Sequence, residues 1–199
     1  WVQHFAHHLA PNGLAGFVMP NGALAVSGKE GELRKKLIEE DLVEVIISCP
    51  SKLFYNVSLP VSLWFLAKNK GGDRFRKRSG ETLFIDARDT FEQISRKQVV
   101  FNPEHIEKIS NTVRAWRGEK DAGKYEDVSG FCKSAAQDEI KKNGYVLTPG
   151  RYVGLADVED DGVSFEEKME KLSSELRDAF SKGRDLEKEI EKNLKELGF

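Results

Sequence analysis

Cysteines and long apolar runs are scarce in this chain of 199 residues. Its two cysteines, Cys49 and Cys132, lie far apart and have no metal-binding spacing, so they indicate neither a disulfide framework nor a zinc site. We expect both to be reduced thiols of a cytoplasmic protein. No apolar run approaches the ~20 residues that cross a bilayer, and the first residues lack the basic-then-apolar layout of a signal peptide. The sequence therefore argues against a membrane protein or a secreted one.

Motifs of catalysis and cofactor binding are also missing. No Gly-x-Gly occurs, which excludes the glycine-rich loop of dinucleotide-binding sheets. No Gly-x-Ser-x-Gly occurs and Cys49 has no recognisable base partner, so a nucleophilic enzyme is not indicated. His4, His7 and His8 share one helical turn, but no acidic or cysteine motif completes a metal site there, and we expect none.

Charge is nearly balanced, and a net charge of -2 argues against nucleic-acid binding by the bulk charge of the chain. The segment 68–78 is nevertheless basic, and Gly71-Gly72 indicates that it is a flexible loop. Two interpretations stay open, a solvated hairpin loop and a loop that contacts phosphates. The candidates for phosphate contact are Lys70, Arg74, Arg76, Lys77 and Arg78.

Short apolar runs closed by Pro, Gly or Asn predict four buried strands in the first part of the chain. The predicted strands are Leu14–Met19, Leu42–Ser48, Val61–Ala67 and Thr82–Asp86. An amphipathic pattern at 32–40 predicts a helix between the first two, and strands that alternate with helices favour a mostly parallel α/β sheet. Helical spacing begins at Trp1, without an initiator Met or an N-cap, so we expect the native chain to extend upstream.

Beyond residue 88 the pattern becomes helical and polar. We expect helices at Pro103–Arg117 and Phe131–Lys142, and then an extended segment punctuated by Pro149-Gly150. Ser164 and Glu167 form a capping box that opens a last, long helix. The predicted parts are residues 1–88, a sheet; 89–153, a helical and extended extension; 154–163, an acidic linker; and 164–199, the long helix.

The last helix carries an apolar seam whose spacings alternate between four and three residues, with charged flanks, as in a coiled coil. Its interface candidates are Phe165, Met169, Leu172, Leu176, Leu186, Ile190 and Leu194. A lone helix cannot bury such a seam on itself, so it has to pack on its own domain or on another chain. The acidic linker favours another chain.

Several segments together resemble one family, the methylation (M) subunits of type I restriction-modification systems, which are S-adenosylmethionine-dependent DNA adenine-N6 methyltransferases. The similar segments are Pro11–Gly13, Val18–Gly22, Leu53–Tyr55, Phe84–Ala87, Gly144–Tyr152 and Leu194–Gly198. The resemblance covers nearly the whole chain. It implies the C-terminal half of a Rossmann-like methyltransferase sheet, followed by a helical tail that ends in a long coiled-coil-like helix.

The two defining sites of that family are absent from this sequence. Its glycine-rich cofactor loop has no counterpart, and its Asn-Pro-Pro-Phe motif is excluded because no two prolines are adjacent. We therefore expect no catalytic and no cofactor-binding residue in this chain. S-adenosylmethionine is expected to bind the parent protein but not this chain alone, which should be inert.

The resemblance also implies a base-stacking residue and partners. Related adenine methyltransferases stack the extruded base on an aromatic residue at the start of the seventh strand of their own sheet. By position, Phe54 or Tyr55 would supply that residue here. The alternative for Phe54 is a core residue beneath the loop. The implied partners are DNA, the specificity (S) subunit, which the last helix would dock, and the restriction (R) subunit. A hypothesis of another class is a non-catalytic nucleic-acid-binding or assembly module.

Overall fold

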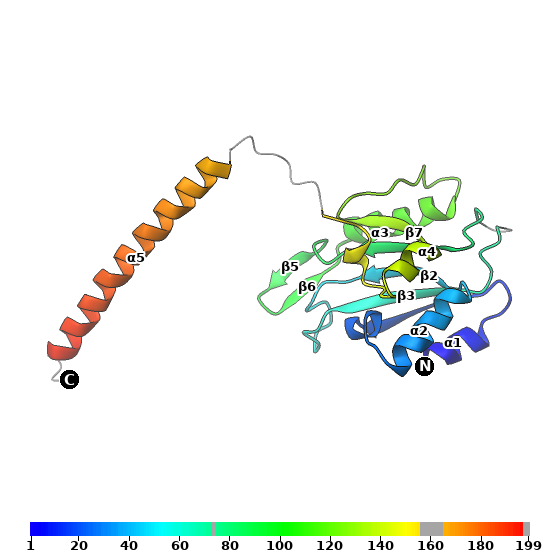
Figure 1. Ribbon diagram of the computed structural model, residues 1–199, viewed down its shortest axis with the longest axis horizontal. Coiled ribbons are helices and arrows are strands. Elements are labelled where there is room, and N and C mark those ends of the chain that lie inside the picture. Colours follow the sequence, from blue (N-terminus) through cyan, green and yellow to red (C-terminus); the bar gives the residue numbers. More distant parts are fainter. Residues whose placement is uncertain (73–74, 156–164, 197–199) are drawn as a thin grey trace. The chain divides into compact units, whose positions relative to one another are not determined.

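The computed structural model describes residues 1–72, 75–155 and 165–196. The chain forms two compact units, Trp1–Asp157 and Val158–Phe199 (Figure 1). The segments expected as separate parts, 1–88 and 89–153, belong to the same unit, because a strand of the second joins the sheet of the first. The predicted capping residue Ser164 and most of the predicted linker lie outside the described residues.

The first unit has a mixed α/β fold built on a five-stranded sheet in the order β1-β3-β2-β4-β7. The strands are β1 (Leu14–Pro20), β2 (Val43–Ser48), β3 (Val61–Ala67), β4 (Glu81–Asp86) and β7 (Cys132–Ala136). The expectation of a mostly parallel sheet is wrong, since among these strands only β2 and β4 pair in parallel. Residues 49–60, all described, contain no helix between β2 and β3, and a connection without a crossover helix returns the next strand antiparallel.

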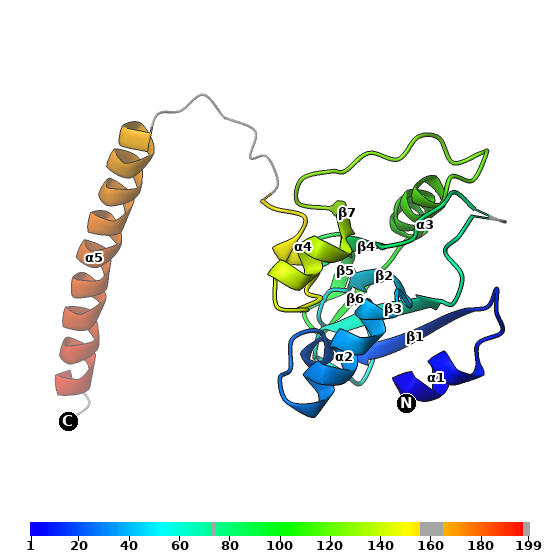
Figure 2. The same cartoon turned by 45° about the vertical axis from the view of Figure 1, so that its right-hand side comes forward.

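Helices cover both faces of this sheet (Figure 2). α2 (Lys29–Glu39) packs on the face that carries Ile46 of β2, whereas α3 (Pro103–Arg117) packs on the face that carries Val45. Neighbouring residues of a strand point to opposite faces, so β2 contributes to both apolar clusters. It is buried along its whole length and forms the centre of the core.

Smaller elements complete the first unit. They are α1 (Val2–His8), the 3-10 turn η1 (Asn21–Leu24), the hairpin of β5 (Glu92–Ser95) and β6 (Gln98–Val100), α4 (Gln137–Lys142) and the 3-10 turn η2 (Pro149–Arg151). The helix predicted at Phe131–Lys142 is wrong in its first half, where β7 pairs with the open edge of β4. Small side chains suit that place: Ala135 is buried, and Ser134 Oγ accepts a 2.8 Å hydrogen bond from the indole of Trp116. Tertiary pairing here overrides the local helical pattern.

The described part of the second unit is one helix, α5 (Phe165–Glu196). Six of the seven interface candidates are exposed along it: Met169, Leu172, Leu176, Leu186, Ile190 and Leu194. The side chain of the seventh, Phe165, lies outside the described residues. Phe180, which the predicted seam does not include, is exposed as well. The apolar seam therefore has no cover within the helix that carries it.

Candidate functional site

The parallel strands β2 and β4 end side by side, at Ser48 and Asp86. Ligands of open α/β sheets bind beyond the carboxyl ends of parallel strands. The loop 49–60 follows β2 here, and residues 87–91 lead from β4 into the β5–β6 hairpin. These loops and the hairpin are therefore where a functional site is expected.

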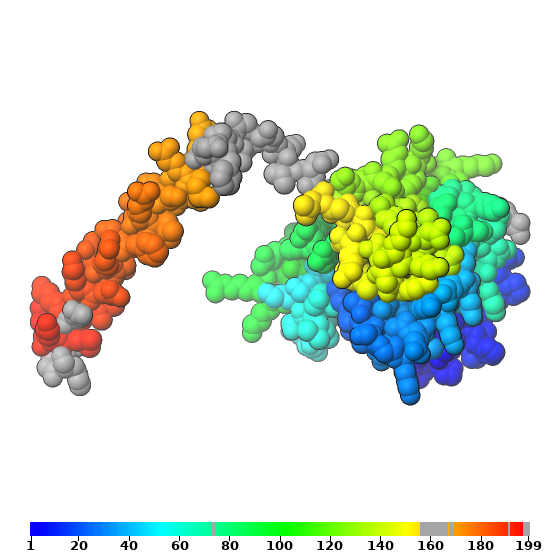
Figure 3. Space-filling model, viewed as in Figure 1, coloured from blue at the N-terminus to red at the C-terminus, as the bar shows by residue number. Residues whose placement is uncertain are grey.

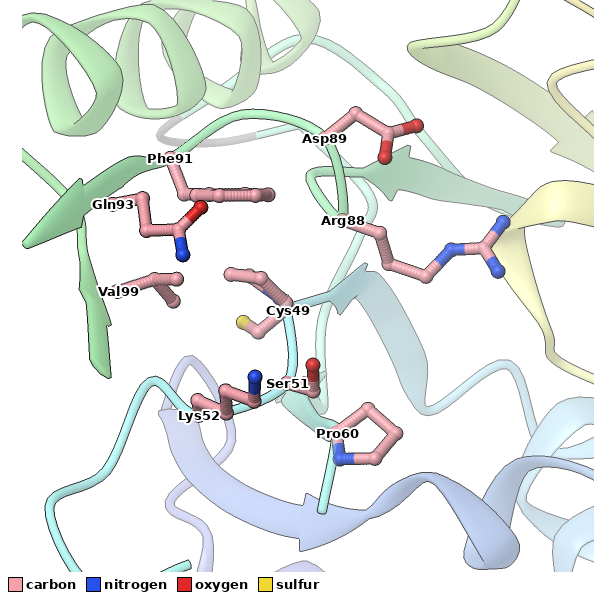
Figure 4. A pocket seen from close by; sticks show the side chains of 10 residues that line it. Cys49, Ser51, Lys52, Pro60, Arg88, Asp89, Phe91, Gln93 and Val99 are labelled. Carbon is pink, nitrogen blue, oxygen red and sulfur yellow. The ribbon is translucent and has the colours of Figure 1, made fainter. Parts of the chain in front are cut away.

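A cavity of about 420 Å³ opens between the two loops (Figure 4). Phe91 and Gln93 line it from the hairpin side, and Ser51 and Lys52 from the loop that follows β2. Polar side chains make up about half of the lining, and the others are apolar or, like Cys49, weakly polar. The cavity thus brings residues of the loop after β2 together with residues of the β4–β5 connection and the hairpin.

Cys49 lines the same cavity, and its thiol is buried. Burial raises the pKa of its thiol to about 11, so the thiol stays protonated near neutral pH. Burial also raises the pKa of Cys132, at the start of β7. Both cysteines are free, buried thiols, and their positions suit packing.

The loop 49–60 presents its two aromatic residues to solvent. A hydrogen bond of 3.2 Å from Val57 N to Phe54 O closes a tight turn there. Tyr55, at the tip of this turn, is 84% exposed, and Phe54 is 43% exposed. The interpretation of Phe54 as a core residue beneath the loop is therefore wrong. Leu59, further along the same loop, is exposed as well.

Two hydrogen bonds at Lys52 join this loop to the β5–β6 hairpin. Val99 N donates to Lys52 O at 3.1 Å, and Lys52 Nζ donates to Arg96 O at 2.8 Å. Lys52 has a φ of 63°, a left-handed conformation that costs a residue other than glycine about 1 to 3 kcal/mol. The two bonds offset part of that cost and fix the aromatic turn relative to the hairpin. Figure 3 shows the green hairpin segment and the cyan loop side by side on the surface of the first unit.

An ion pair forms another part of the rim. Arg88 Nη2 lies 2.6 Å from Asp86 Oδ2, and Arg88 Nε lies 2.8 Å from Asp86 Oδ1. The hydrogen bond to Asp86 raises the pKa of Arg88. Gly150 packs against this pair so closely that a Cβ there would lie 2.9 Å from Arg88 Nη2. Two residues further on, the ring of Tyr152 stacks on Phe84 with 3.9 Å between centroids, which holds this segment on the sheet.

Two candidates for phosphate contact are buried in ion pairs instead. Lys70 Nζ lies 2.6 Å from Asp41 Oδ1, and Arg78 Nη2 lies 2.7 Å from Glu44 Oε1. Both cationic side chains are only 2% exposed. The expectation that Lys70 and Arg78 contact phosphates is therefore wrong, because their charges compensate carboxylates inside the unit.

The other three candidates differ in position. Arg76 Nη2 lies 2.6 Å from Glu81 Oε2, and its guanidinium packs over the ring of Trp116. Lys77 is exposed, and Arg74 lies outside the described residues. The segment is also not a hairpin loop, because β2 lies between the two strands that it connects.

Sequence reasoning missed the β5–β6 hairpin and the cations around its tip, Arg96, Lys97 and Lys52. Two-residue hairpin turns are recognised by Gly or Asn, and Arg96-Lys97 has neither. The proximity of Lys52 to Arg96 is a tertiary contact across 44 positions, which no local pattern reports.

The described residues offer neither a cluster that could hold a metal ion nor a membrane-spanning helix. In that part of the chain, no group of three or more His, Cys, Asp or Glu side chains is placed to hold a metal ion. Nor does any helix there combine the length and the apolar character needed to span a bilayer.

Comparison with known proteins links this geometry to a family. Residues 1–161 match the family model described as N-6 DNA Methylase. The type I restriction enzyme MjaIX methylase subunit of Methanocaldococcus jannaschii is 50% identical over 199 residues, which are 100% of this chain and 35% of that protein. The HindI methylase subunit of Haemophilus influenzae is 46% identical over 200 residues, or 100% of this chain and 43% of that protein.

A solved structure gives the same result. The type I restriction-modification system methyltransferase subunit from Streptococcus thermophilus is 33% identical and has a TM-score of 0.64, over 77% of this chain and 29% of that one. The chain spans less than half the length of each of these three proteins. Because the family model matches most of the sequence and both curated relatives align with all of it, this chain belongs to the N-6 DNA methylase family and is similar to the methylase subunits of type I restriction enzymes.

Proposed function

We propose that this chain is the part of a type I DNA adenine-N6 methyltransferase subunit that contacts the target DNA and docks the partner subunits. Its sheet would be the C-terminal half of a Rossmann-like methyltransferase sheet. The observation that carries the proposal is the exposed turn of Phe54 and Tyr55 at the carboxyl edge of β2. Family membership and the methylase subunits to which the chain is similar support it.

The role of the aromatic turn follows from the geometry of a base in duplex DNA. An enzyme that modifies a base has to extrude it from the stack, at a cost of a few kcal/mol. A ring that stacks on the extruded base returns about 1–3 kcal/mol. Tyr55, 84% exposed, can offer a ring face without first breaking contacts of its own. Phe54, at the base of the same turn, is the second candidate.

The residues of this chain do not fit the cofactor. S-adenosylmethionine would supply the methyl group in the parent protein, and the family holds it with a glycine-rich loop. The turn after β1 is Pro20-Asn21-Gly22, and no Gly-x-Gly follows any strand. The catalytic Asn-Pro-Pro-Phe is missing as well. We therefore propose that the chain binds no cofactor and catalyses no transfer by itself.

The second unit supplies the docking part of the proposal. α5 carries an uncovered apolar seam with charged flanks, which suits pairing with another helix. We assign that partner to the specificity subunit, and the complex would also contain the restriction subunit. DNA sequence would be read by the specificity subunit and not by this chain.

The proposal is tested by methylation of duplex DNA in the full-length subunit, assembled with its partners. Tyr55→Ala and Phe54→Ala should lower the rate of transfer roughly tenfold or more, if stacking contributes about 1–3 kcal/mol. Binding of S-adenosylmethionine should not change. Leu59→Ala, an exposed apolar residue of the same loop, is the matched control and should retain most activity.

Fluorescence of 2-aminopurine placed at the target adenine gives a second readout, because it rises when the base leaves the stack. Wild-type rates in both aromatic variants would contradict the stacking role. DNA binding without any transfer in the wild-type complex would favour a non-catalytic nucleic-acid-binding or assembly module.

A further inference from the structure

The β5–β6 hairpin follows the carboxyl end of β4 and carries two adjacent cations at its tip. All residues from Glu92 to Lys97 are exposed, and Arg96-Lys97 forms the turn between the strands. The register shifts between Gln93 and Ser95, which marks a bulge, and Ser95 Oγ accepts a 3.2 Å hydrogen bond from Lys97 N. Bulges are frequent next to functional sites, where they reorient side chains.

A third cation lies beneath this tip. Lys52 Nζ donates to Arg96 O, so its ammonium group is held against the turn. An ammonium group has three N–H donors, and this bond uses one of them. No carboxylate of the described residues forms an ion pair with Lys52, Arg96 or Lys97, in contrast to the buried pairs of Lys70 and Arg78.

We propose that this cationic tip, defined as Lys52, Arg96 and Lys97, contacts the phosphate backbone of duplex DNA next to the extruded adenine. The inference rests on the proposed function, which makes duplex DNA the partner. It moves the phosphate contact from the segment 68–78, where two of the candidates are buried, to a hairpin that the sequence did not single out.

The position of the tip supports a role beside the target base. Lys52 is two residues before the Phe54–Tyr55 turn and is bonded to the hairpin by both its carbonyl and its ammonium group. Aromatic and cationic groups are thus held on one edge of the sheet. Stacking needs a ring, and a nucleotide that leaves the helix needs its flanking phosphates held in place.

Nearby acids limit where the phosphate can lie. Glu92 is at the base of the hairpin and Asp89 lines the cavity, so an anion is favoured at the tip and not deeper between the loops. Contacts of this kind fix the register of the protein on the duplex and carry no sequence information. The cationic tip should therefore bind without sequence preference.

The test compares the salt dependence of duplex binding by the full-length methylase subunit in its complex. The variant is Arg96→Ala/Lys97→Ala, and the control is Lys141→Ala/Lys142→Ala, which removes two adjacent exposed cations from α4. The probe is a fluorescent duplex of about 30 base pairs that contains one target site. The hairpin variant should bind roughly tenfold more weakly, and its plot of log K against log salt should be shallower by about 2, or about 1 for each lost phosphate contact.

A second hairpin variant separates the effect of charge from that of side-chain length. Arg96→Gln/Lys97→Gln retains the length of the side chains and should show the same loss if charge is the cause. The proposal is wrong if both hairpin variants keep the wild-type affinity and the wild-type slope of log K against log salt. It is also wrong if the control variant loses as much affinity as they do. Failure of the base-stacking role is seen separately, because Tyr55→Ala would then transfer methyl groups at the wild-type rate while the hairpin variants still lost affinity. The proposal would also be contradicted if the hairpin variants bound single-stranded RNA more weakly than the wild type but bound duplex DNA equally well.

Discussion

Arg78 and Glu44 form an ion pair inside the first unit, with 2.7 Å between Nη2 and Oε1 and side chains that are 2% and 0% exposed. Arg117 Nη2 contacts the other carboxylate oxygen, also at 2.7 Å. The three residues come from the β3–β4 connection, from β2 and from α3, so the cluster ties three separate parts of the unit together. Burial lowers the pKa of Arg78, and the neighbouring Glu44 opposes that shift.

Removal of one partner from this pair should destabilise the fold strongly. Arg78→Ala leaves Glu44 fully buried with a single cation, and breaking a buried pair typically costs about 3 to 5 kcal/mol. Lys77→Ala, one position earlier and exposed, is the control and should change the free energy of unfolding by less than about 0.5 kcal/mol. Urea unfolding followed by circular dichroism measures both. Equal midpoints for the two variants would contradict the structural role of the pair.

The stability of the chain should fall at alkaline pH because of Cys49. Its thiol titrates near 9.0 when unperturbed and at about 11 in the fold. Below pH 9 both states hold the proton and the contribution is complete. As pH rises from 9 to 11 the unfolded chain loses its proton first, so stability declines, by at most about 1.4 kcal/mol per pH unit.

Cys49→Ala isolates this contribution, because all other groups titrate alike in both proteins. The difference in free energy of unfolding between wild type and variant should shrink or reverse as pH rises from 9 to 11, and stay level below 9. A difference that is constant across that range would mean that the thiol is not protected from water.

A charge placed in the seam of α5 should block assembly. Leu172→Glu or Leu176→Glu in the full-length subunit should abolish co-purification with the specificity subunit, since an unpaired charge in an apolar interface costs several kcal/mol. Ser174→Glu adds the same charge to the same helix, away from the seam, and is the matched control. The melting temperature of the methylase subunit alone should not change. Wild-type stoichiometry in the Leu172 and Leu176 variants would show that this helix is not the docking element.

Elements with local signals could be predicted from the sequence. β3 and α3 have the predicted bounds, Val61–Ala67 and Pro103–Arg117. The start and the end of α3 are set by neighbours in sequence: Asn102 accepts a hydrogen bond from His105 N, and Gly118 ends the helix with a φ of 76°. Such interactions depend on residue type and spacing alone.

Elements and charges with distant partners could not be predicted. β7 is a strand because β4 offers an open edge, and its own residues favour a helix as readily. Lys70 is basic in any local view, but Asp41 lies 29 positions earlier and neutralises it. Phe54 and Tyr55 stay predicted candidates because of their position before β3, whereas their exposure depends on how the loop 49–60 is held by the hairpin.

The strand order also determines when each strand can pair with its neighbour during translation. β1 pairs with β3 among the described strands, joining Leu14 to Ala67 and Pro20 to Val61, so it leaves the ribosome well before the residues that will cover its edge. At about 5–20 residues per second, that interval lasts seconds, during which an apolar strand is available to other nascent chains. Slow synthesis of residues 21–60 should therefore favour aggregation, and a chaperone that holds β1 should raise the yield of folded protein.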